Sequence, residues 1–434
     1  MKFQAWFQCF AGCAVRYQLD EIVYRCESCG GLLEVRHDVE ALKQRPANDW
    51  KQLFDSRLGR MSGVWSKKEV VLPELQDNSI VSLGEGNSPL IKSERLARHL
   101  GINETYIKQC GTSHTGSFKD LGMTVLVSMV NQIRSRVRAV ACASTGDTSA
   151  ALSAYCAASG IPSIVFLPKD KVSLAQLIQP VANNAITLSI DTDFDGCMNI
   201  VQEITKDNSI YLANSLNSLR VEGQKTIAFE IVQQMNWDVP DFVVVPGGNL
   251  GNVSAIGSGF LLMKELGLVS RLPRLVCAQT ERANPLYRSY REGFANLQTV
   301  TAGKTHATAI QIGNPVSFGK AVKALRATNG IVEQATETEL VNACAEVDRF
   351  GFFNDPQTGV ALAATMKLVQ SRMIPASSRV VVISTAHGLK FAEFKTKFHQ
   401  GQLPEINPSL QNLPIQVPAD VSAVRAAIDG RIPA

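Results

Sequence analysis

The feature that most constrains the fold is a regular alternation of short apolar segments and longer helical segments, which begins near residue 105. Short apolar segments separated by helical ones predict strands joined by helical crossovers, and such strands pair in parallel. The sequence therefore predicts an α/β fold with two open parallel sheets. The first series of expected strands is 105–108, 138–143, 163–168, 185–190 and 210–213, and the second is 241–245, 275–279, 330–333 and 379–384.

The composition argues against several classes of protein. The chain has 434 residues, of which 45% are hydrophobic, and this length indicates two to three domains at about 100–200 residues each. The net charge is only +4 and the basic residues are scattered, so no nucleic-acid partner is expected. No apolar run reaches about 18 residues without glycine or charge, so no membrane span is expected. Residues 1–6 resemble neither a secretory signal nor a transit peptide, and the cytoplasm is the expected location.

A small, hydroxyl-rich loop with one lysine, residues 113–120 (SHTGSFKD), leads into an apolar helical segment at 121–133. Ser117 is the expected N-cap of this helix. Lys119 then lies at the helix start, where the positive end of the helix dipole disfavours the ammonium form. A lysine held as a free amine can form an imine with an aldehyde. The alternative is a solvated lysine, and only the other sites separate the two.

A second loop, residues 246–252 (PGGNLGN), connects an expected strand directly to an expected helix. Backbone N–H groups of such a loop converge on a phosphate, which the helix N-terminus also favours. The loop lacks both the Gly-Lys-Ser/Thr of a P-loop and the GxGxxG spacing. It therefore predicts a small phosphate-bearing cofactor rather than ATP or NAD, the alternative being a tight turn.

The strand at 379–384 ends in Thr385, which places a neutral hydroxyl at the carboxyl edge of the sheet, where ligands bind in parallel α/β folds. An imine-forming lysine, a cradle for one phosphate and a partner for a ring nitrogen are what pyridoxal 5′-phosphate (PLP) requires. A hydroxyl, unlike a carboxylate, does not hold the pyridine nitrogen protonated. The sequence therefore predicts a PLP enzyme whose electron sink is tuned by Thr385.

Four cysteines near the N-terminus form two close pairs, one spaced CxxxC and the other CxxC followed by glycine. Thiolates at this spacing share one tetrahedral Zn²⁺ in zinc ribbons. The alternative is a degraded ribbon whose thiols stay free in a reducing compartment. The expected metal ligands are Cys9, Cys13, Cys26 and Cys29.

The motifs closely resemble those of threonine synthases of the plant-type branch, which are fold-type II PLP enzymes. The resemblance covers nearly the whole chain and is carried by residues 113–120, 143–152, 214–225, 246–252 and 385–390. It implies Lys119 as the Schiff-base lysine, Thr385 as the partner of the pyridine nitrogen and Asp147 beside the cofactor's 3′-hydroxyl. The implied cradle for the cofactor phosphate is Gly248, Asn249, Leu250, Gly251 and Asn252.

The same resemblance implies that O-phospho-L-homoserine and water are converted to L-threonine and phosphate, with Lys119 as the general base. A phosphate dianion requires several hydrogen-bond donors and a guanidinium. The implied donors to the substrate are Ser144, Thr145, Thr148, Asn214, Ser215 and Arg220. Two alternatives remain: another fold-type II lyase, such as a threonine or serine dehydratase or cysteate synthase, and a zinc-ribbon interaction protein with an inactive enzyme domain.

The expected organisation has four parts. A zinc-ribbon-like segment at 1–45 and an extension at 46–104 precede a smaller α/β domain at 105–230 with Lys119 and the substrate loops. A larger domain at 231–434 carries the cofactor-phosphate cradle and a C-terminal segment that wraps the surface. The resemblance also implies a homodimer.

The plant-type branch is activated by S-adenosylmethionine, and the matching region of this chain departs from it at two positions. Pro89 stands in place of an asparagine and Arg98 in place of a lysine. Because proline has no N–H, one contact to the ligand is lost. The sequence therefore argues against activation by this compound.

Overall fold

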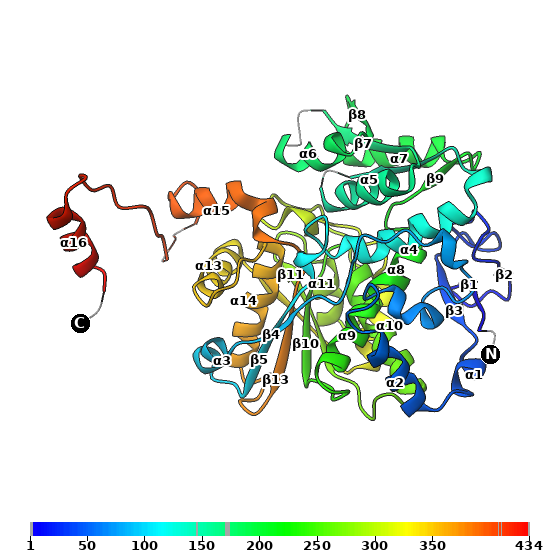
Figure 1. Cartoon of the computed structure of the whole chain (residues 1–434), viewed down its shortest axis with the longest axis horizontal. Coiled ribbons are helices and arrows are strands. Elements are labelled where there is room, and N and C mark those ends of the chain that lie inside the picture. Colours follow the sequence, from blue (N-terminus) through cyan, green and yellow to red (C-terminus); the bar gives the residue numbers. More distant parts are fainter. Residues whose placement is uncertain (1–2, 145, 170–173, 407, 409, 433–434) are drawn as a thin grey trace.

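The computed structural model describes residues 3–144, 146–169, 174–406, 408 and 410–432, so Thr145 lies outside the described residues. Within these residues the strands form three sheets (Figure 1). The strands are β1 Ala5–Cys9, β2 Arg16–Tyr17, β3 Leu33–His37, β4 Leu90–Lys92, β5 Glu104–Gln109, β6 Ala139–Ala143, β7 Ser163–Pro168, β8 Ile186–Ile190, β9 Ile210–Leu212, β10 Phe242–Pro246, β11 Arg274–Thr280, β12 Ile331–Ala335 and β13 Arg379–Ser384.

The helices that connect and cover these sheets carry no membrane span: none of those in the described residues is long and apolar enough to cross a bilayer. They are α1 Val39–Lys43, α2 Ala47–Arg57, α3 Glu94–Leu100, α4 Lys119–Gln132, α5 Asp147–Ser159, α6 Leu174–Ala182, α7 Phe194–Ile204, α8 Leu219–Gln224, α9 Thr226–Gln234, α10 Gly251–Glu265, α11 Pro285–Arg291, α12 Phe318–Ala327, α13 Glu337–Asp348, α14 Pro356–Gln370, α15 Ala392–His399 and α16 Val421–Asp429.

The largest sheet has the strand order β12-β11-β10-β13-β5-β4 and is parallel except for β4. Successive residues of its central strand β10 enter different apolar cores. Val243 and Val245 pack on the side covered by α10, whereas Phe242 and Val244 pack on the side covered by α13 and α14. Burial on both faces explains why the central strands are continuous apolar runs rather than alternating ones.

The prediction that residues 105–108 share a sheet with the four strands that follow them is wrong. β5 pairs in parallel with β13 along its whole length, from Glu104 opposite Arg379 to Gln109 opposite Ser384. The chain then passes through α4 into the smaller sheet, so the expected domain boundary at residue 105 does not coincide with a sheet boundary. A strand–helix alternation gives the order of strands along the chain, but it does not say which sheet a strand joins.

The smaller sheet has the order β8-β7-β6-β9 and is entirely parallel. Helices α5, α6 and α7 pack against it, and Figure 1 shows this unit above the larger sheet. The carboxyl ends of β6 and β9 lead into the segments that begin at Ser144 and Asn214. Because β6 and β9 are neighbours in the sheet, these two segments lie side by side.

The N-terminal sheet has the order β2-β1-β3 and is antiparallel. Phe7 of β1 and Leu33 of β3 are almost fully buried and belong to the same apolar core as α4 and α10. This small sheet therefore shares a core with α4 and α10, and Figure 1 shows it beside α8 and α10.

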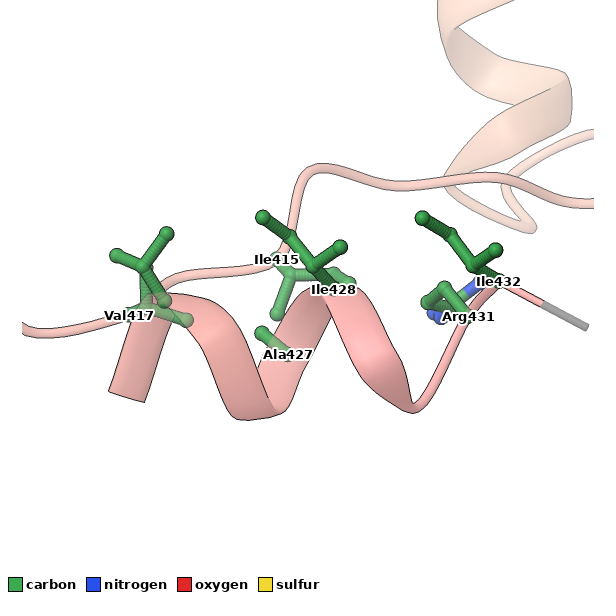
Figure 2. Close-up of a pocket in the computed structure, with 7 residues that line it drawn as sticks. Ile415, Val417, Ala427, Ile428, Arg431 and Ile432 are labelled. Carbon is green, nitrogen blue, oxygen red and sulfur yellow. The ribbon is translucent and has the colours of Figure 1, made fainter. Parts of the chain in front are cut away.

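The C-terminal segment departs from the expected wrap over the surface. The helix predicted near 421–428 is present as α16, but none of its residues is buried and it stands apart from the body (Figure 1). Its apolar side faces Ile415 and Val417 of the preceding extended segment, and together they line a cavity of about 430 Å³ (Figure 2). The cavity is far from Lys119 and is not part of the candidate active site.

Candidate active site

The lysine loop is held against the carboxyl end of β13 by backbone hydrogen bonds. The Phe118 N–H donates to the Thr385 carbonyl at 2.9 Å, and the His387 N–H donates to the Gly116 carbonyl at 2.9 Å. The approach is so close that a Cβ on Gly111 would lie 2.4 Å from the backbone of Ala386. Lys119 and Thr385, which are far apart in the sequence, therefore meet at the same edge of the larger sheet.

Lys119 is the first residue of α4, and the N-cap position is Phe118 rather than the predicted Ser117. The Ser117 hydroxyl instead accepts a weaker hydrogen bond from the Lys119 N–H at 3.3 Å. The Lys119 ammonium lies 4.0 Å from the centre of the Phe118 ring. Loss of hydration and the charge of Arg220 lower the pKa of Lys119 to about 7, against the opposing effect of Asp147. A large fraction of this side chain is therefore a free amine at neutral pH.

The loop is also fixed from within by a buried carboxylate. The Asp120 carboxylate accepts hydrogen bonds from the backbone N–H of Thr115, at 2.8 Å, and from the Thr115 hydroxyl. Burial raises the pKa of Asp120 to about 7, although both of these hydrogen bonds oppose the rise. Asp120 thus shapes the turn that presents Lys119.

The glycine loop forms a cradle at the N-terminus of α10. Leu250 has a φ of +64°, which is unusual for a branched residue and is a form of strain that clusters at binding sites. Gly248 packs directly on Ile310, so that a Cβ there would lie 2.9 Å from the Ile310 Cα. Both amide atoms of Asn252 are buried and have no hydrogen-bond partner among the described residues. An anion at this helix start would supply the missing acceptor.

Thr385 is supported by a buried carboxylate that the sequence did not reveal. Its hydroxyl lies 3.4 Å from the Asp355 carboxylate, and its N–H donates to the Thr358 hydroxyl at 3.1 Å. Asp355 also accepts from the N–H of Ala386 at 2.9 Å. Burial raises the pKa of Asp355 despite these hydrogen bonds. The only sequence signal was that Asp355 could cap the helix that begins at Pro356, a role it also fills.

Asp147 has a cationic partner that the sequence did not predict. Lys390, in the turn after β13, places its ammonium 3.0 Å from the Asp147 carboxylate at the start of α5. The same ammonium donates to the Thr115 carbonyl at 2.9 Å and to the Gln179 side chain at 3.0 Å. Lys390 therefore joins the lysine loop, the larger sheet and two helices of the smaller unit.

The substrate-binding residues predicted on the smaller unit are brought together only in part. Arg220 is buried, donates to the Ala213 carbonyl at 3.1 Å and reaches the Thr148 hydroxyl at 3.4 Å. Its Nε has no partner among the described residues. Burial lowers the pKa of Arg220 to about 10, so the guanidinium stays charged at neutral pH. Arg220 and Thr148 thus form a cationic, hydroxyl-lined position beside Lys119.

Two further residues of the predicted set, Ser144 and Ser215, form hydrogen bonds with residues of α5 and of the glycine loop. The Ser144 hydroxyl accepts from the Ser149 N–H at 3.3 Å, and the Ser215 hydroxyl accepts from the Asn249 amide at 3.4 Å. Asn214, also of the predicted set, forms hydrogen bonds within the protein. The Asn214 amide accepts from the Ala143 N–H at 3.0 Å and donates to the Ala143 carbonyl at 2.9 Å, so it ties β9 to β6.

These arrangements fit PLP. A partly buried amine, a glycine cradle with unsatisfied amide atoms at a helix N-terminus and a strand-end hydroxyl lie around one edge of the larger sheet. When bound, PLP supplies an aldehyde and an electron sink that acidifies the protons next to a substrate's amino group. In the N-terminal segment, the sulfur atoms of Cys9, Cys13, Cys26 and Cys29 all lie within 4.8 Å of one another.

Comparison with known proteins agrees with this geometry. A family described as pyridoxal-phosphate dependent enzymes matches residues 81–386. Threonine synthase 2, chloroplastic, of Arabidopsis thaliana is 59% identical over 418 residues, covering 94% of this chain and 81% of that protein. Threonine synthase of Methanocaldococcus jannaschii is 42% identical over 379 residues, covering 87% of this chain and 91% of that protein.

Solved structures agree on the fold. The structure of threonine synthase from Escherichia coli matches with a TM-score of 0.68 at 19% identity, covering 98% of this chain and all of that one. This structure confirms the predicted α/β fold, and the family match and the curated relatives confirm the predicted cofactor. The chain belongs to the threonine synthases, within the pyridoxal-phosphate dependent enzyme family.

Proposed function

We propose that this chain catalyses the conversion of O-phospho-L-homoserine and water to L-threonine and phosphate. The observation that carries the proposal is the buried guanidinium of Arg220, which lies close enough to Lys119 to lower its pKa. A site that places an unneutralised buried cation and a hydroxyl beside the reactive lysine is suited to a phosphorylated substrate. The named activity of the Arabidopsis and archaeal relatives supports the same conclusion.

In the proposed reaction, Lys119 Nζ acts as the base and acid at the substrate's α-carbon. It accepts the α-proton as a free amine and returns it at the end. Arg220 and Thr148 hold the substrate phosphate while the bond between the γ-carbon and the ester oxygen breaks. A β-proton is lost in the same step and leaves with the departing group, which becomes hydrogen phosphate. Water then supplies a hydroxyl group to the β-carbon and a proton to the γ-carbon, which balances the reaction as threonine plus phosphate.

Thr385 and the cradle of Gly248, Asn249, Leu250, Gly251 and Asn252 would hold the cofactor's ring nitrogen and phosphate. Asp355 orients the Thr385 hydroxyl, because its carboxylate accepts from that hydroxyl at 3.4 Å and is itself held by the N–H groups of Thr358 and Ala386. Asp147 would lie near the cofactor's hydroxyl with Lys390 as its counter-ion. These assignments follow from position and from the chemistry of the donors.

The test of the proposed function is a comparison of products. Purified protein loaded with PLP should release one phosphate per threonine from O-phospho-L-homoserine and should form no keto acid. Release of keto acid from threonine or serine, with O-phospho-L-homoserine inert, would instead identify a dehydratase. Similarity in fold does not decide between these two reactions. The processed threonine deaminase isoform 2 of Solanum lycopersicum matches at only 17% identity, which shows a shared fold alone.

We predict that Gly248→Ala weakens PLP binding. The added Cβ would lie 2.9 Å from the Ile310 Cα, a distance that real Cβ contacts do not adopt, so the cradle must shift. An outward shift of the loop should raise the Kd of PLP by roughly 10-fold or more, measured by titration of the apoprotein. Gly430→Ala in the C-terminal segment, where the nearest atom to a Cβ is 3.4 Å away, is the remote control. Equal affinity of the two variants would contradict the cradle.

The rate at which apoprotein captures PLP should depend on pH near neutrality. The pKa of Lys119 is lowered to about 7. Below that pH the ammonium cannot attack an aldehyde, and above it the amine can. The free amine, and with it the capture rate, should rise roughly tenfold between pH 6 and pH 8. Stopped-flow measurement of imine absorbance checks this, and a rate that rises only near the ordinary lysine pKa would contradict it.

We also propose that the protein is a homodimer in which a second copy covers α16. Val424 and Ile428 of this helix are 39% and 48% exposed, and a nine-residue amphipathic helix is not stable alone in water. Light scattering during size-exclusion chromatography should give twice the chain mass. Deletion of residues 410–434 should then shift the protein toward monomer.

We infer that the enzyme works in the cytoplasm and without activation by S-adenosylmethionine. All ten cysteines are free in the structure, as expected for thiols of a reducing compartment. Pro89 is exposed and offers no N–H at the position where the plant-type branch has an asparagine. Addition of S-adenosylmethionine should leave the rate of phosphate release unchanged.

A further inference from the structure

The four N-terminal cysteines have the geometry of a metal site. Their sulfur atoms lie within 4.8 Å of one another, and those of Cys9 and Cys29 are 3.5 Å apart. Four thiolates at about 2.3 Å from one Zn²⁺ would be separated by roughly 3.8 Å in a tetrahedron. The Gly31 N–H donates to Cys29 Sγ at 3.4 Å, which is an orientation that stabilises a thiolate. A Cβ on Gly31 would lie 3.1 Å from the same sulfur, so a side chain here would crowd the cluster.

The sheet that carries these cysteines is attached to the segment that ends in Arg220. Leu33, which pairs with Cys9 across β1 and β3, uses its carbonyl to accept from the Ser218 hydroxyl and, at 2.6 Å, from the Lys320 ammonium. The Tyr24 hydroxyl, between the two cysteine pairs, accepts from the Leu212 N–H at 2.7 Å. The N-terminal sheet therefore contacts both ends of the segment from the end of β9 to the start of α8.

A second set of contacts lies at the end of β3. His37 is within 2.8 Å of the Glu222 carboxylate and 2.9 Å of the Lys225 ammonium, and Lys225 also contacts Glu222 directly. These side chains are buried. Glu222 lies on α8 two residues after Arg220, so this network fixes the helix that presents the guanidinium. In a buried network each polar group depends on its partners, because a lone one is costly.

We propose that Cys9, Cys13, Cys26 and Cys29 bind one Zn²⁺ and that the metal holds strand β3 as a brace for residues 212–225. Cys9 is the last residue of β1 and is paired with Leu33 of β3. The metal therefore closes the end of the sheet at which the Leu33 carbonyl contacts Ser218 and Lys320. The site is structural, because four thiolates leave no coordination position for a substrate. Its effect on catalysis rests on the proposed function, since only there does Arg220 hold the substrate phosphate.

The metal is tested first. The protein as purified should contain one zinc per chain by elemental mass spectrometry. The double variant Cys13→Ser/Cys29→Ser, which removes the two least buried thiols, should contain less than a tenth of that amount. Cys156→Ser, which changes a buried thiol outside the cluster, is the matched control and should keep the metal. A metal-free wild-type protein, reconstituted with Zn²⁺ without uptake, would overturn the proposal.

The brace is tested without any substrate, by hydrogen exchange of the wild-type PLP-loaded protein before and after removal of zinc with a chelator. Amides of residues 212–225 should exchange at least tenfold faster after removal, whereas those of α14 should not change. Restoration by added Zn²⁺ shows that the chain has not simply unfolded. Unchanged exchange of residues 212–225 would overturn the brace, whatever the enzyme's substrate proves to be.

A variant that keeps the metal tests the contacts of β3 separately from zinc binding. His37→Phe retains all four cysteines and a ring of similar size but removes the contacts to Glu222 and Lys225. It should bind one zinc, show faster exchange at residues 212–225 and raise the KM for O-phospho-L-homoserine roughly tenfold while kcat stays within about twofold. A roughly tenfold fall in kcat with an unchanged KM would contradict a role in holding Arg220. If O-phospho-L-homoserine is not a substrate, the exchange result still decides the brace.

Discussion

Lys119→Ala should abolish turnover of O-phospho-L-homoserine. The variant lacks both the amine that forms an imine with PLP and the base that moves the α-proton. A general base alone contributes about 10²–10⁴-fold to the rate, so kcat should fall by at least about 10³-fold. Phosphate release measures the turnover, and the absorbance spectrum of the purified variant should lack the imine band of the wild type.

The matched control for this variant is Lys92→Ala. Lys92 is an exposed lysine on β4 whose ion pair with Glu104, at 2.6 Å, is screened by solvent and contributes little to stability. Its removal should leave kcat and the imine spectrum unchanged. Lys119→Ala that retained turnover together with a full imine spectrum would show that another lysine carries the cofactor.

Arg220→Ala should chiefly raise the KM for O-phospho-L-homoserine. Each charge-assisted hydrogen bond to a phosphate contributes about 1.5–3 kcal/mol, so loss of the guanidinium should weaken binding roughly 10- to 150-fold per contact. Arg220→Lys keeps the charge but loses the planar fork and should recover only part of the affinity. The apoprotein gives an independent readout. Because Arg220 helps to lower the pKa of Lys119, its loss should shift the pH midpoint of PLP capture upward.

Arg138→Ala is the control for the loss of one arginine. Arg138 is exposed next to the start of β6, at the opposite end of the strand from Ser144, and its removal should change neither KM nor the pH midpoint. A dehydratase needs no guanidinium for a substrate phosphate. If Arg220→Ala left the KM for O-phospho-L-homoserine unchanged, the phosphate would have to be bound elsewhere and the proposed substrate site would fail.

Local patterns were sufficient to predict most elements of the fold. The apolar runs of β10 and β13 are short, bounded by polar turns and buried on both faces, so they have little freedom to be anything but central strands. The same patterns failed for β5. Its sequence fits either sheet, and its partner β13 lies about 270 residues further along the chain, beyond the reach of any local pattern.

The candidate site shows the same limit. Lys119, Thr385 and the glycine loop are each visible in the sequence, because their chemistry depends on residues next to them in the chain. Asp355 and Lys390 were missed because their partners, Thr385 and Asp147, are distant in sequence and meet them only in the folded protein. Asn214 illustrates a related limit. An asparagine in a polar loop can serve a ligand or the backbone, and the neighbouring strand end uses both of its amide groups.

The hydrogen bonds between the lysine loop and the end of β13 have a mechanical consequence. They make the residues that would hold the cofactor, Lys119 and Thr385, parts of one rigid piece. Thr148, on α5, belongs to the other piece, and Lys390 is a polar latch between the two. A shift of α5 relative to the larger sheet would therefore move Thr148 and leave Lys119 joined to Thr385. Substrate choice can then diverge between proteins of this fold while the cofactor anchor stays the same.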